Sequence, residues 1–566
     1  MYTNLLKKWL GPILIVFLSF VVLVPLIYPG LPATHDGLDH VARIANFYQS
    51  LTEGNVVPRW AGNLNWGYGH PILMFLYPLS SYLASLFHFL GFSFVESTKL
   101  VFGAAFILSG LTMYLWLREL LDENSAVVGA LLYNFAPYRF VDVYVRGAIG
   151  ENMAFVFPPL VFYYLLKISK SDSFNRYYFV FASFSFAGLV LAHNAISLMF
   201  IPLIIFYGVY LFFINKKKKS LSYQYLAIII LGFALSAFFV LPAFLEGKYT
   251  LRDIVTNGLA LERFVDFKSL LYSPWSFRGS TFFSVQVGLL QWIGVIAFPV
   301  VLYYLFYRKE KNLILYVFVF LTFWASIFIM LPISESLWKF VTTLQKFQFP
   351  WRFLSVSVFS SAILFSFLVY IFPKYLQKIF LILIVIIMLL INYDYWQPTD
   401  YHYNSESYYS GVYKGTTDTG ESSPIWSVRF MEHTASASAE VLKGSAVITP
   451  LTRSSTRHTY DINAEFRTRV RENTLYFPGW RIYIDGKLYP GVQFQDPESR
   501  GLMTYYVPTG KHRVDVIFGD TRLRTISNYI SLGALLLVIG ILLNTFKTKS
   551  ITGNASVKRN KGDNLL

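Results

Sequence analysis

The sequence predicts an α-helical polytopic membrane protein that carries a separate β-rich domain near its C-terminus. Of its 566 residues, 55% are hydrophobic and only 14% are charged, and the mean hydropathy is +0.47, far from the balance of a water-soluble chain. Long apolar runs recur along most of the sequence. Late in the chain they give way to short segments in which apolar and polar residues alternate, as in β-strands.

Apolar runs of this kind indicate about 12 membrane-spanning helices, because a span needs about 20 mostly apolar residues. Many runs end in aromatic residues, which favour the level of the lipid headgroups and can lengthen a short run. The candidate spans are residues 11–28, 100–117, 127–135, 153–166, 178–191, 195–213, 226–241, 287–306, 313–330, 353–372, 379–391 and 530–543.

The basic residues predict the orientation of these spans. If Lys7 and Lys8 are cytoplasmic, strict alternation places every dense basic turn on the cytoplasmic side, as the positive-inside rule requires. These turns are residues 118–123, 167–176, 216–219, 308–311, 374–378 and the tail after residue 546. The apolar stretch 71–92 would break this parity if it crossed the membrane. We interpret it as an interfacial or re-entrant segment, with an ordinary span as the alternative.

The resulting topology divides the chain into four parts. Residues 1–392 form the transmembrane domain, and residues 393–527 form an extracytoplasmic, sandwich-like β domain with turns at Asp485-Gly486 and Pro508-Thr-Gly510. Residues 528–546 form the final span, and residues 547–566 form a basic cytoplasmic tail. The expected outer loops are 29–99, 136–152, 242–286 and 331–352. We therefore expect a multi-pass plasma-membrane protein.

Charge and cysteine content exclude several classes of function. The net charge is +16, but the basic residues lie mostly in short turns between apolar runs, so we expect no nucleic-acid partner. The chain has no cysteine, which excludes disulfides, thiolate chemistry and cysteine-ligated metals.

The first outer loop holds the densest polar cluster, the segment 34–43 with the sequence THDGLDHVAR. If Asp36 opens a helix, His40 and Arg43 share its face at i+4 and i+7. A carboxylate there could act as the general base that deprotonates an attacking hydroxyl. Helix capping by Asp36 and Asp39 is one alternative, and a His/Asp metal cluster is another. The candidate residues of this loop are His35, Asp36, Asp39, His40 and Arg43.

The second outer loop contributes Asp142, Arg146 and Glu151. Charges at the mouth of a helix bundle are costly unless they are paired or functional. Asp142 and Arg146, four residues apart, could form only an ion pair. Glu151 could be a carboxylate favoured by the helix dipole, or a second acid that faces Asp36 across a cavity.

Two further polar residues lie at outer ends of spans. His193 stands at a helix corner, where a satisfied interfacial histidine is the alternative to a substrate contact. Arg352 enters a span behind the aromatic residues of Phe349-Pro-Trp351. Its guanidinium suits a lipid phosphate, whereas plain snorkelling would need no ligand.

Several short motifs carry a family resemblance. His35-Asp36-Gly37, Pro58-Arg59-Trp60, Arg146-Gly147-Ala148 with Glu151, and Phe349-Pro350-Trp351-Arg352 resemble the membrane proteins labelled 6-pyruvoyl-tetrahydropterin synthase-related. The order of spans and acidic outer loops resembles the GT-C superfamily of glycosyltransferases that use polyprenyl-phosphate-linked sugars. The stretch 477–487 with 510–514 is similar to the C-terminal β domain of YfhO-type glycosyltransferases.

The GT-C resemblance implies a sugar transferase with a lipid-linked donor. It implies that Asp36 is the base, that Asp142 or Glu151 assists the acceptor or a metal, and that Arg146 or Arg352 contacts the donor phosphate. The implied partners are a polyprenyl-phosphate-linked sugar, membrane lipid, and a glycan, lipid or protein acceptor. No metal ligand is assigned, since the second loop lacks an Asp-x-Asp motif, and a requirement for Mg²⁺ or Mn²⁺ stays open. No histidine arrangement suits pterin chemistry.

Two other functions stay open at this point: a transporter or lipid flippase, and a non-catalytic cell-envelope scaffold whose β domain binds glycan. Transporters tend to show internal repeats and ionisable residues near the membrane midplane. Here the span interiors carry almost no charge and the polar residues gather at one rim, which favours chemistry at the membrane surface.

Overall fold

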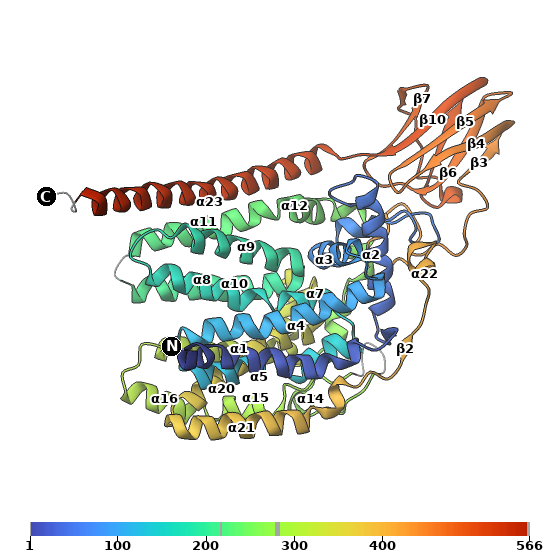
Figure 1. Ribbon diagram of the computed structural model, residues 1–566. Helices are drawn as coiled ribbons and strands as arrows, with labels where there is room; N and C mark the ends of the chain where they lie inside the picture. The colour runs from blue at the N-terminus through green and yellow to red at the C-terminus, as the bar shows by residue number, and fades with distance from the viewer. Residues whose placement is uncertain (1, 216–217, 278–282, 563–566) are drawn as a thin grey trace.

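The computed structural model describes residues 2–215, 218–277 and 283–562. Its helices form an elongated bundle, and a β domain extends from one end of it (Figure 1). The start of the first helix and the far end of the last helix lie at the opposite end of the bundle. Of the predicted basic turn 216–219, Lys216 and Lys217 lie outside the described residues.

Eight helical segments within the described residues are long and apolar enough to cross a membrane. They belong to α1 (Tyr2–Leu23), α4 (Phe94–Arg118), α7 with α8 (Ile149–Ala154 and Phe157–Lys170), α10 (Asn194–Ile214), α17 (Leu313–Met330), η7 with α20 (Pro350–Phe353 and Leu354–Tyr370), α21 (Lys374–Ile391) and α23 (Arg522–Gly562). These segments confirm a polytopic helical membrane protein.

Two bent helix pairs raise the number of spans to as many as ten. The first pair is α11 (Lys218–Leu235) with α12 (Ala237–Leu245), bent by 73°, and the second is α15 (Leu289–Ile296) with α16 (Phe298–Tyr307), bent by 44°. Pro299 stands in the first turn of α16, where its missing N–H costs least.

The remaining two of the 12 predicted spans are shorter helices, so that number is not confirmed. They are α5 (Glu123–Asn134), with 12 residues, and α9 (Arg176–Ala192), with 17 residues. Nearly every side chain of α5 is buried in the bundle. Neighbouring helices cover such a helix on most sides. Its residues are therefore apolar although the helix is shorter than a span that faces lipid.

The stretch 71–92 forms η2 (Pro71–Met74) and α3 (Leu79–Phe89) instead of one long helix. With 11 residues, α3 reaches only about 16 Å, roughly half the thickness of the hydrocarbon core. It therefore does not cross the membrane alone, in line with an interfacial segment. It lies beside α2 (Gly37–Thr52) near the β domain (Figure 1).

Two antiparallel sheets form the C-terminal domain and confirm its predicted sandwich-like character. One has five strands in the order β4-β5-β10-β7-β8, and the other has three in the order β3-β6-β9. The strands are β3 (Ala439–Lys443), β4 (Ala446–Arg453), β5 (Arg457–Ala464), β6 (Thr468–Leu475), β7 (Trp480–Ile484), β8 (Lys487–Tyr489), β9 (Leu502–Val507) and β10 (Gly510–Phe518).

Trp60 joins the β domain to the helical domain. Its ring lies 5.4 Å from the rings of both Trp480 and Phe518 (centroid distances), and it is buried in the same apolar core as the inner residues of the strands. Burial of an aromatic ring of this size stabilises a junction by a few kcal/mol, roughly. The two domains therefore share a core instead of being joined only by a linker.

A long connection precedes the first large strand. Residues 411–431, here called the strap, contain no helix or strand in the structure. The β character predicted for residues 393–527 is thus confined mainly to residues 439–518, with only the short β2 (Tyr401–His402) and α22 (Glu406–Ser410) before them. The strap runs over the loop-bearing end of the helical bundle, where the candidate site lies.

Candidate functional site

The first and second outer loops are held together by their backbones. The N–H of His35 donates to the carbonyl of Val145 at 3.0 Å, and that of Asp36 donates to the carbonyl of Arg146 at 2.9 Å. Gly147 has a left-handed φ of +67°, and a Cβ there would lie 2.4 Å from Thr34 Oγ1. Only glycine suits this close approach, so the motif around Gly147 fixes the start of α2 against the second loop.

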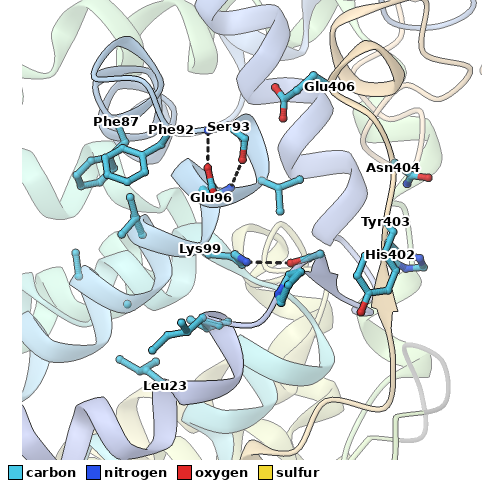
Figure 2. Close-up of a pocket in the computed structure, with 18 of the residues that line it drawn as sticks. Leu23, Phe87, Phe92, Ser93, Glu96, Lys99, His402, Tyr403, Asn404 and Glu406 are labelled. Carbon is cyan, nitrogen blue, oxygen red and sulfur yellow. Dashed lines mark hydrogen bonds between the residues drawn. The ribbon is translucent and has the colours of Figure 1, made fainter.

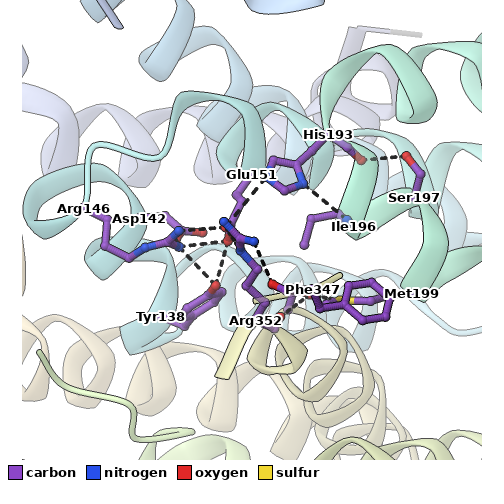
Figure 3. A network of polar contacts seen from close by, with 11 residues as sticks. Tyr138, Asp142, Arg146, Glu151, His193, Ile196, Ser197, Met199, Phe347 and Arg352 are labelled. Atoms are coloured by element: carbon purple, nitrogen blue, oxygen red, sulfur yellow. Dashed lines mark hydrogen bonds and ion pairs between the residues drawn. The ribbon is translucent and has the colours of Figure 1, made fainter. Parts of the chain in front are cut away.

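A buried network of charges fills the second loop (Figure 3). The carboxylate of Glu151, at the start of α7, accepts from Arg146 Nη1 at 2.9 Å, from Arg146 Nη2 at 2.7 Å and from Arg352 Nε at 3.0 Å. Tyr138 Oη donates to the same carboxylate at 2.7 Å. Glu151 is thus bound by two guanidiniums and a phenol, and its geometry is that of a residue that holds others in place.

Arg146 has little capacity left for a ligand. Besides Glu151, its Nη1 contacts Asp142 Oδ1 at 2.7 Å, which confirms the predicted ion pair, and its guanidinium lies over the ring of Trp351 at 4.4 Å. The segment from Val141 to Val145 forms a π-helical turn, a local irregularity that often occurs at functional sites.

Arg352 is held from one side and open on the other. Its Nε binds Glu151, and its Nη1 donates to the carbonyl of Phe347 at 2.8 Å. Its Nη2 makes no hydrogen bond with any residue that the structure describes, and the side chain is 16% exposed. Of the two predicted phosphate ligands, Arg352 therefore keeps a free terminal nitrogen, whereas both terminal nitrogens of Arg146 are already bonded.

Asp36 stands immediately before α2, at its N-cap position, but its side chain makes no capping hydrogen bond. Among the described residues it also has no ion pair, although Arg146, Arg43 and Arg352 are close enough for their charges to act on it. The side chain is exposed to solvent while protein groups surround it on most sides. The capping alternative thus lacks its hydrogen bond, and the carboxylate is open.

The surroundings of Asp36 also change its acidity. The neighbouring protein groups remove water from the carboxylate, which raises the pKa of Asp36 above its ordinary value of 3.8. The positive charges of Arg146 and Arg43 lower this pKa, but by less. A raised pKa makes a carboxylate a stronger base, provided that it is still ionised at the working pH.

The other predicted residues of the first loop turn towards the strap. Asp39 accepts a hydrogen bond from Tyr413 Oη at 2.7 Å. Arg43 donates from Nε to Thr417 Oγ1 at 3.3 Å and from Nη2 to the carbonyl of Thr417, and its Nη1 lies 3.0 Å from His40 Nδ1. Asp39 and Arg43 therefore fix the strap on α2, and His40 supports Arg43. The predicted parts of these three residues in catalysis and substrate binding stay untested.

The two remaining histidines have local partners. His193 Nδ1 accepts from the N–H of Ile196 at 3.3 Å and caps α10, while its Nε2 lies 3.8 Å from Glu151. His35 Nε2 lies 3.2 Å from the carbonyl of Phe277. The structure thus brings Asp36, Asp142, Arg146, Glu151, His193 and Arg352 to one end of the bundle, as a continuous set of neighbours.

Sequence reasoning missed several residues of this site. Trp351 lies within the motif Phe349-Pro350-Trp351-Arg352, and Tyr138 lies within the predicted second outer loop. An aromatic residue beside charged residues was the available signal. Tyr413 and Thr417 lie 374 residues from their partners on α2. No local pattern marks a contact over that distance.

Two cavities border this end of the protein. One, of about 570 Å³, is lined by Glu262, Asp266, Phe283 and Trp351 among others. Phe283 packs edge-on against Trp351 at 4.9 Å between centroids and also contacts the ring of His35, at 6.2 Å. The cavity therefore shares an aromatic wall with the site.

The second cavity, of about 810 Å³, lies between α1, α4 and the end of α3 (Figure 2). Its walls are mainly apolar, and Lys99 lies at its polar end, where Nζ donates to the carbonyls of Tyr28 and Gly30 at 2.8 and 3.0 Å. Gly30 immediately precedes β1 (Leu31–Pro32), which leads to Asp36.

The acids of the second loop are already occupied by arginines. Within the described residues, no group of three or more His, Cys, Asp or Glu side chains is arranged to hold a metal. Both oxygens of Glu151 accept from guanidiniums, and Asp142 is paired with Arg146. Mg²⁺ is commonly held by one or two carboxylates together with water and substrate phosphates, so a requirement for Mg²⁺ or Mn²⁺ stays a prediction, and we route no chemical step through a metal.

Comparisons with solved structures found distant likenesses. The arabinofuranosyltransferase AftD from mycobacteria is 13% identical with a TM-score of 0.44, over 69% of this chain and 27% of that chain. ArnT from Cupriavidus metallidurans, in complex with undecaprenyl phosphate, is 11% identical with a TM-score of 0.35, over 70% of this chain and 67% of that chain. A likeness at these scores carries no argument about the activity of this chain.

The sequence relatives are more informative about the family. An uncharacterized protein of Lactococcus lactis subsp. cremoris (strain MG1363) is 28% identical over 242 residues, which cover 41% of this chain and only 38% of that protein. The family model described as 6-pyruvoyl-tetrahydropterin synthase related domain, membrane protein, matches residues 73–399, more than half of the chain. This chain therefore belongs to the 6-pyruvoyl-tetrahydropterin synthase-related family of membrane proteins, as its motifs predicted.

Proposed function

We propose that this chain is a membrane glycosyltransferase of the GT-C type, which transfers a sugar from a polyprenyl-phosphate donor to an acceptor on the extracytoplasmic face. The observation that carries this proposal is the open carboxylate of Asp36 within the influence of three guanidiniums, one of which, Arg352, has a free Nη2. A base within the electrostatic influence of an anion-binding group suits the displacement of a phosphate by a hydroxyl.

The proposed reaction uses Asp36 as the base and Arg352 as the group that binds the phosphate. Asp36 removes the proton from an acceptor hydroxyl while that oxygen forms a bond with C1 of the sugar. The bond between C1 and the phosphate oxygen breaks, and its electron pair leaves with the polyprenyl phosphate. Arg352, anchored by Glu151 and the carbonyl of Phe347, stabilises the negative charge that develops on the phosphate.

The lipid tail has a place near this site. The apolar cavity beside α1 and α4 borders spanning helices and ends at polar residues near the start of β1, so it suits a molecule with a long apolar tail and a polar head. This position favours a lipid-linked donor over a soluble one. The basic turns predict that the same end of the bundle faces away from the cytoplasm.

The proposal is tested by sugar transfer in native membranes, which supply both lipid and acceptors. Membranes with overproduced protein receive polyprenyl-phosphate-linked hexoses and pentoses labelled in the sugar, and label that leaves the donor is counted. We expect Asp36→Asn to lower transfer by about 10²-fold or more and to keep the melting temperature, because the carboxylate makes no capping bond. Asp253→Asn, at a 74% exposed side chain in another outer loop, should transfer normally.

The outcomes also separate the two alternative functions. A flippase would move the labelled donor across the membrane without breaking its sugar-phosphate bond, and a scaffold would leave it untouched. Full activity of Asp36→Asn would contradict the assignment of the base. Loss of folding in Asp36→Asn would return Asp36 to a structural role.

A further inference from the structure

The strap contacts two segments that carry residues of the candidate site, α2 and residues 347–352. Tyr413 and Thr417 bind α2 through Asp39 and Arg43. Asp418 Oδ1 lies 3.6 Å from Nε2 of the buried His70. Near the middle of the strap, Glu421 accepts a hydrogen bond from Gln348 in the 347–352 segment. The C-terminal part of the chain therefore supplies one wall of the site, although it is distant in sequence.

Among the residues that the structure describes, only one of the two carboxylate oxygens of Glu421 has hydrogen-bond partners. Its Oε2 accepts from Gln348 Nε2 at 3.1 Å and from Thr419 Oγ1 at 2.7 Å. Its Oε1 has no hydrogen-bond partner among the residues that the structure describes, and the side chain is half-buried. The carboxylate is thus oriented by two donors and retains one oxygen for a ligand.

A short chain of contacts connects Glu421 with Arg352. Gln348, its partner, follows Phe347, whose carbonyl accepts from Arg352 Nη1. The charge of Arg352 also acts on both Glu421 and Asp36. Glu421 and Asp36 are therefore two incompletely bonded carboxylates in the neighbourhood of the same guanidinium.

We infer that Glu421 is a specificity-determining residue that binds hydroxyl groups of the transferred sugar, with Gln348 as its positioning partner. This inference rests on the proposed function and names the part of the site that recognises the sugar. A carboxylate repels a phosphate and accepts strongly from hydroxyls. The sugar next to the phosphate is the part of the donor that Glu421 can bind, once Arg352 holds the phosphate.

The test compares two lipids on the full-length protein. Binding of undecaprenyl phosphate and of undecaprenyl-phosphoryl hexoses and pentoses is measured in nanodiscs. We expect Glu421→Gln to weaken binding of the preferred sugar-lipid by about tenfold and to leave binding of undecaprenyl phosphate unchanged. The matched control is Glu432→Gln, at a 64% exposed carboxylate just beyond the strap, whose partner Arg500 lies at 3.4 Å. It should bind both lipids as the wild type does.

A second variant, Gln348→Asn, tests the inference even if Glu421→Gln does not fold. Gln348 has a left-handed φ of 61°, which asparagine tolerates, so Gln348→Asn keeps the backbone but shortens the side chain that orients Glu421. It should weaken sugar-lipid binding selectively, and by less than Glu421→Gln does.

Four results would overturn the inference. Normal sugar-lipid binding by Glu421→Gln would remove its basis, and so would equal weakening for both lipids. A wild type that binds the sugar-lipids no better than undecaprenyl phosphate would show that no sugar subsite exists, while lipid binding itself would stand. If the wild type bound none of these lipids, the inference and the proposed function would fail together.

Discussion

Asp36 and Glu151 stand at the starts of two helices at the same end of the bundle, yet their surroundings are opposite. Glu151 is 1% exposed and binds two guanidiniums and a phenol. Asp36 is exposed and binds none of the arginines that lie near it. A carboxylate can accept a substrate proton only if its oxygens are free. In the proposed reaction, the first loop therefore supplies the reactive group and the second loop holds its electrostatic surroundings in place.

The largest expected effect is a difference in stability between Glu151→Gln and Asp36→Asn. Glu151→Gln leaves Arg146 and Arg352 without their shared counter-charge, at positions that are 7% and 16% exposed. Removing one partner of a buried ion pair typically costs about 3–5 kcal/mol. We therefore expect Glu151→Gln to lower the melting temperature in detergent strongly. Asp36→Asn should change it little. Equal losses in the two variants would remove the distinction between a reactive and a supporting acid.

The pH dependence should single out Asp36. Because its surroundings raise the pKa of Asp36 above 3.8, transfer should fall about tenfold per pH unit once the pH drops below that raised value. In the folded protein this acid holds its proton more tightly than in the unfolded chain, so its contribution to stability falls as the pH rises from 3.8 through the raised pKa.

The sign of this linkage can be measured with Asp36→Asn. At neutral pH this variant should be slightly more stable than the wild type, and the two should become equal near and below pH 3.8. Melting curves across this range are the measurement. A wild type that gains stability relative to Asp36→Asn as the pH rises would mean that Asp36 forms a stabilising ion pair.

Most of the helical fold could be predicted, because lipid requires long apolar runs and each predicted run became one helix or a bent pair of helices. Length failed as a guide for α5 and α9, since a helix buried by its neighbours need not match the bilayer. The sequence also located Asp36, Arg146 and Arg352. Whether a carboxylate is open or bound could not be predicted, because Arg352 is 201 residues from Glu151 and spacing indicates faces of one helix only.

The smallest expected effect is the loss of one hydrogen bond between the strap and α2. Tyr413→Phe removes only the hydroxyl that donates to Asp39 at 2.7 Å, so the ring packing remains and stability should fall by about 1 kcal/mol. Tyr408→Phe is the matched control, because its ring lies 5.9 Å from that of Tyr413 (centroid distance) and its side chain is 44% exposed.

Transfer is the more informative measurement for Tyr413→Phe. If the strap only braces the loops, transfer should follow the small loss in stability and recover at lower temperature. If Asp39 itself takes the proton, loss of its hydrogen bond should change the rate and its pH profile at every temperature, because Tyr413 lowers the pKa of Asp39 against the effect of burial. We expect the first result, since Asp39 is bonded to the strap and Asp36 is open.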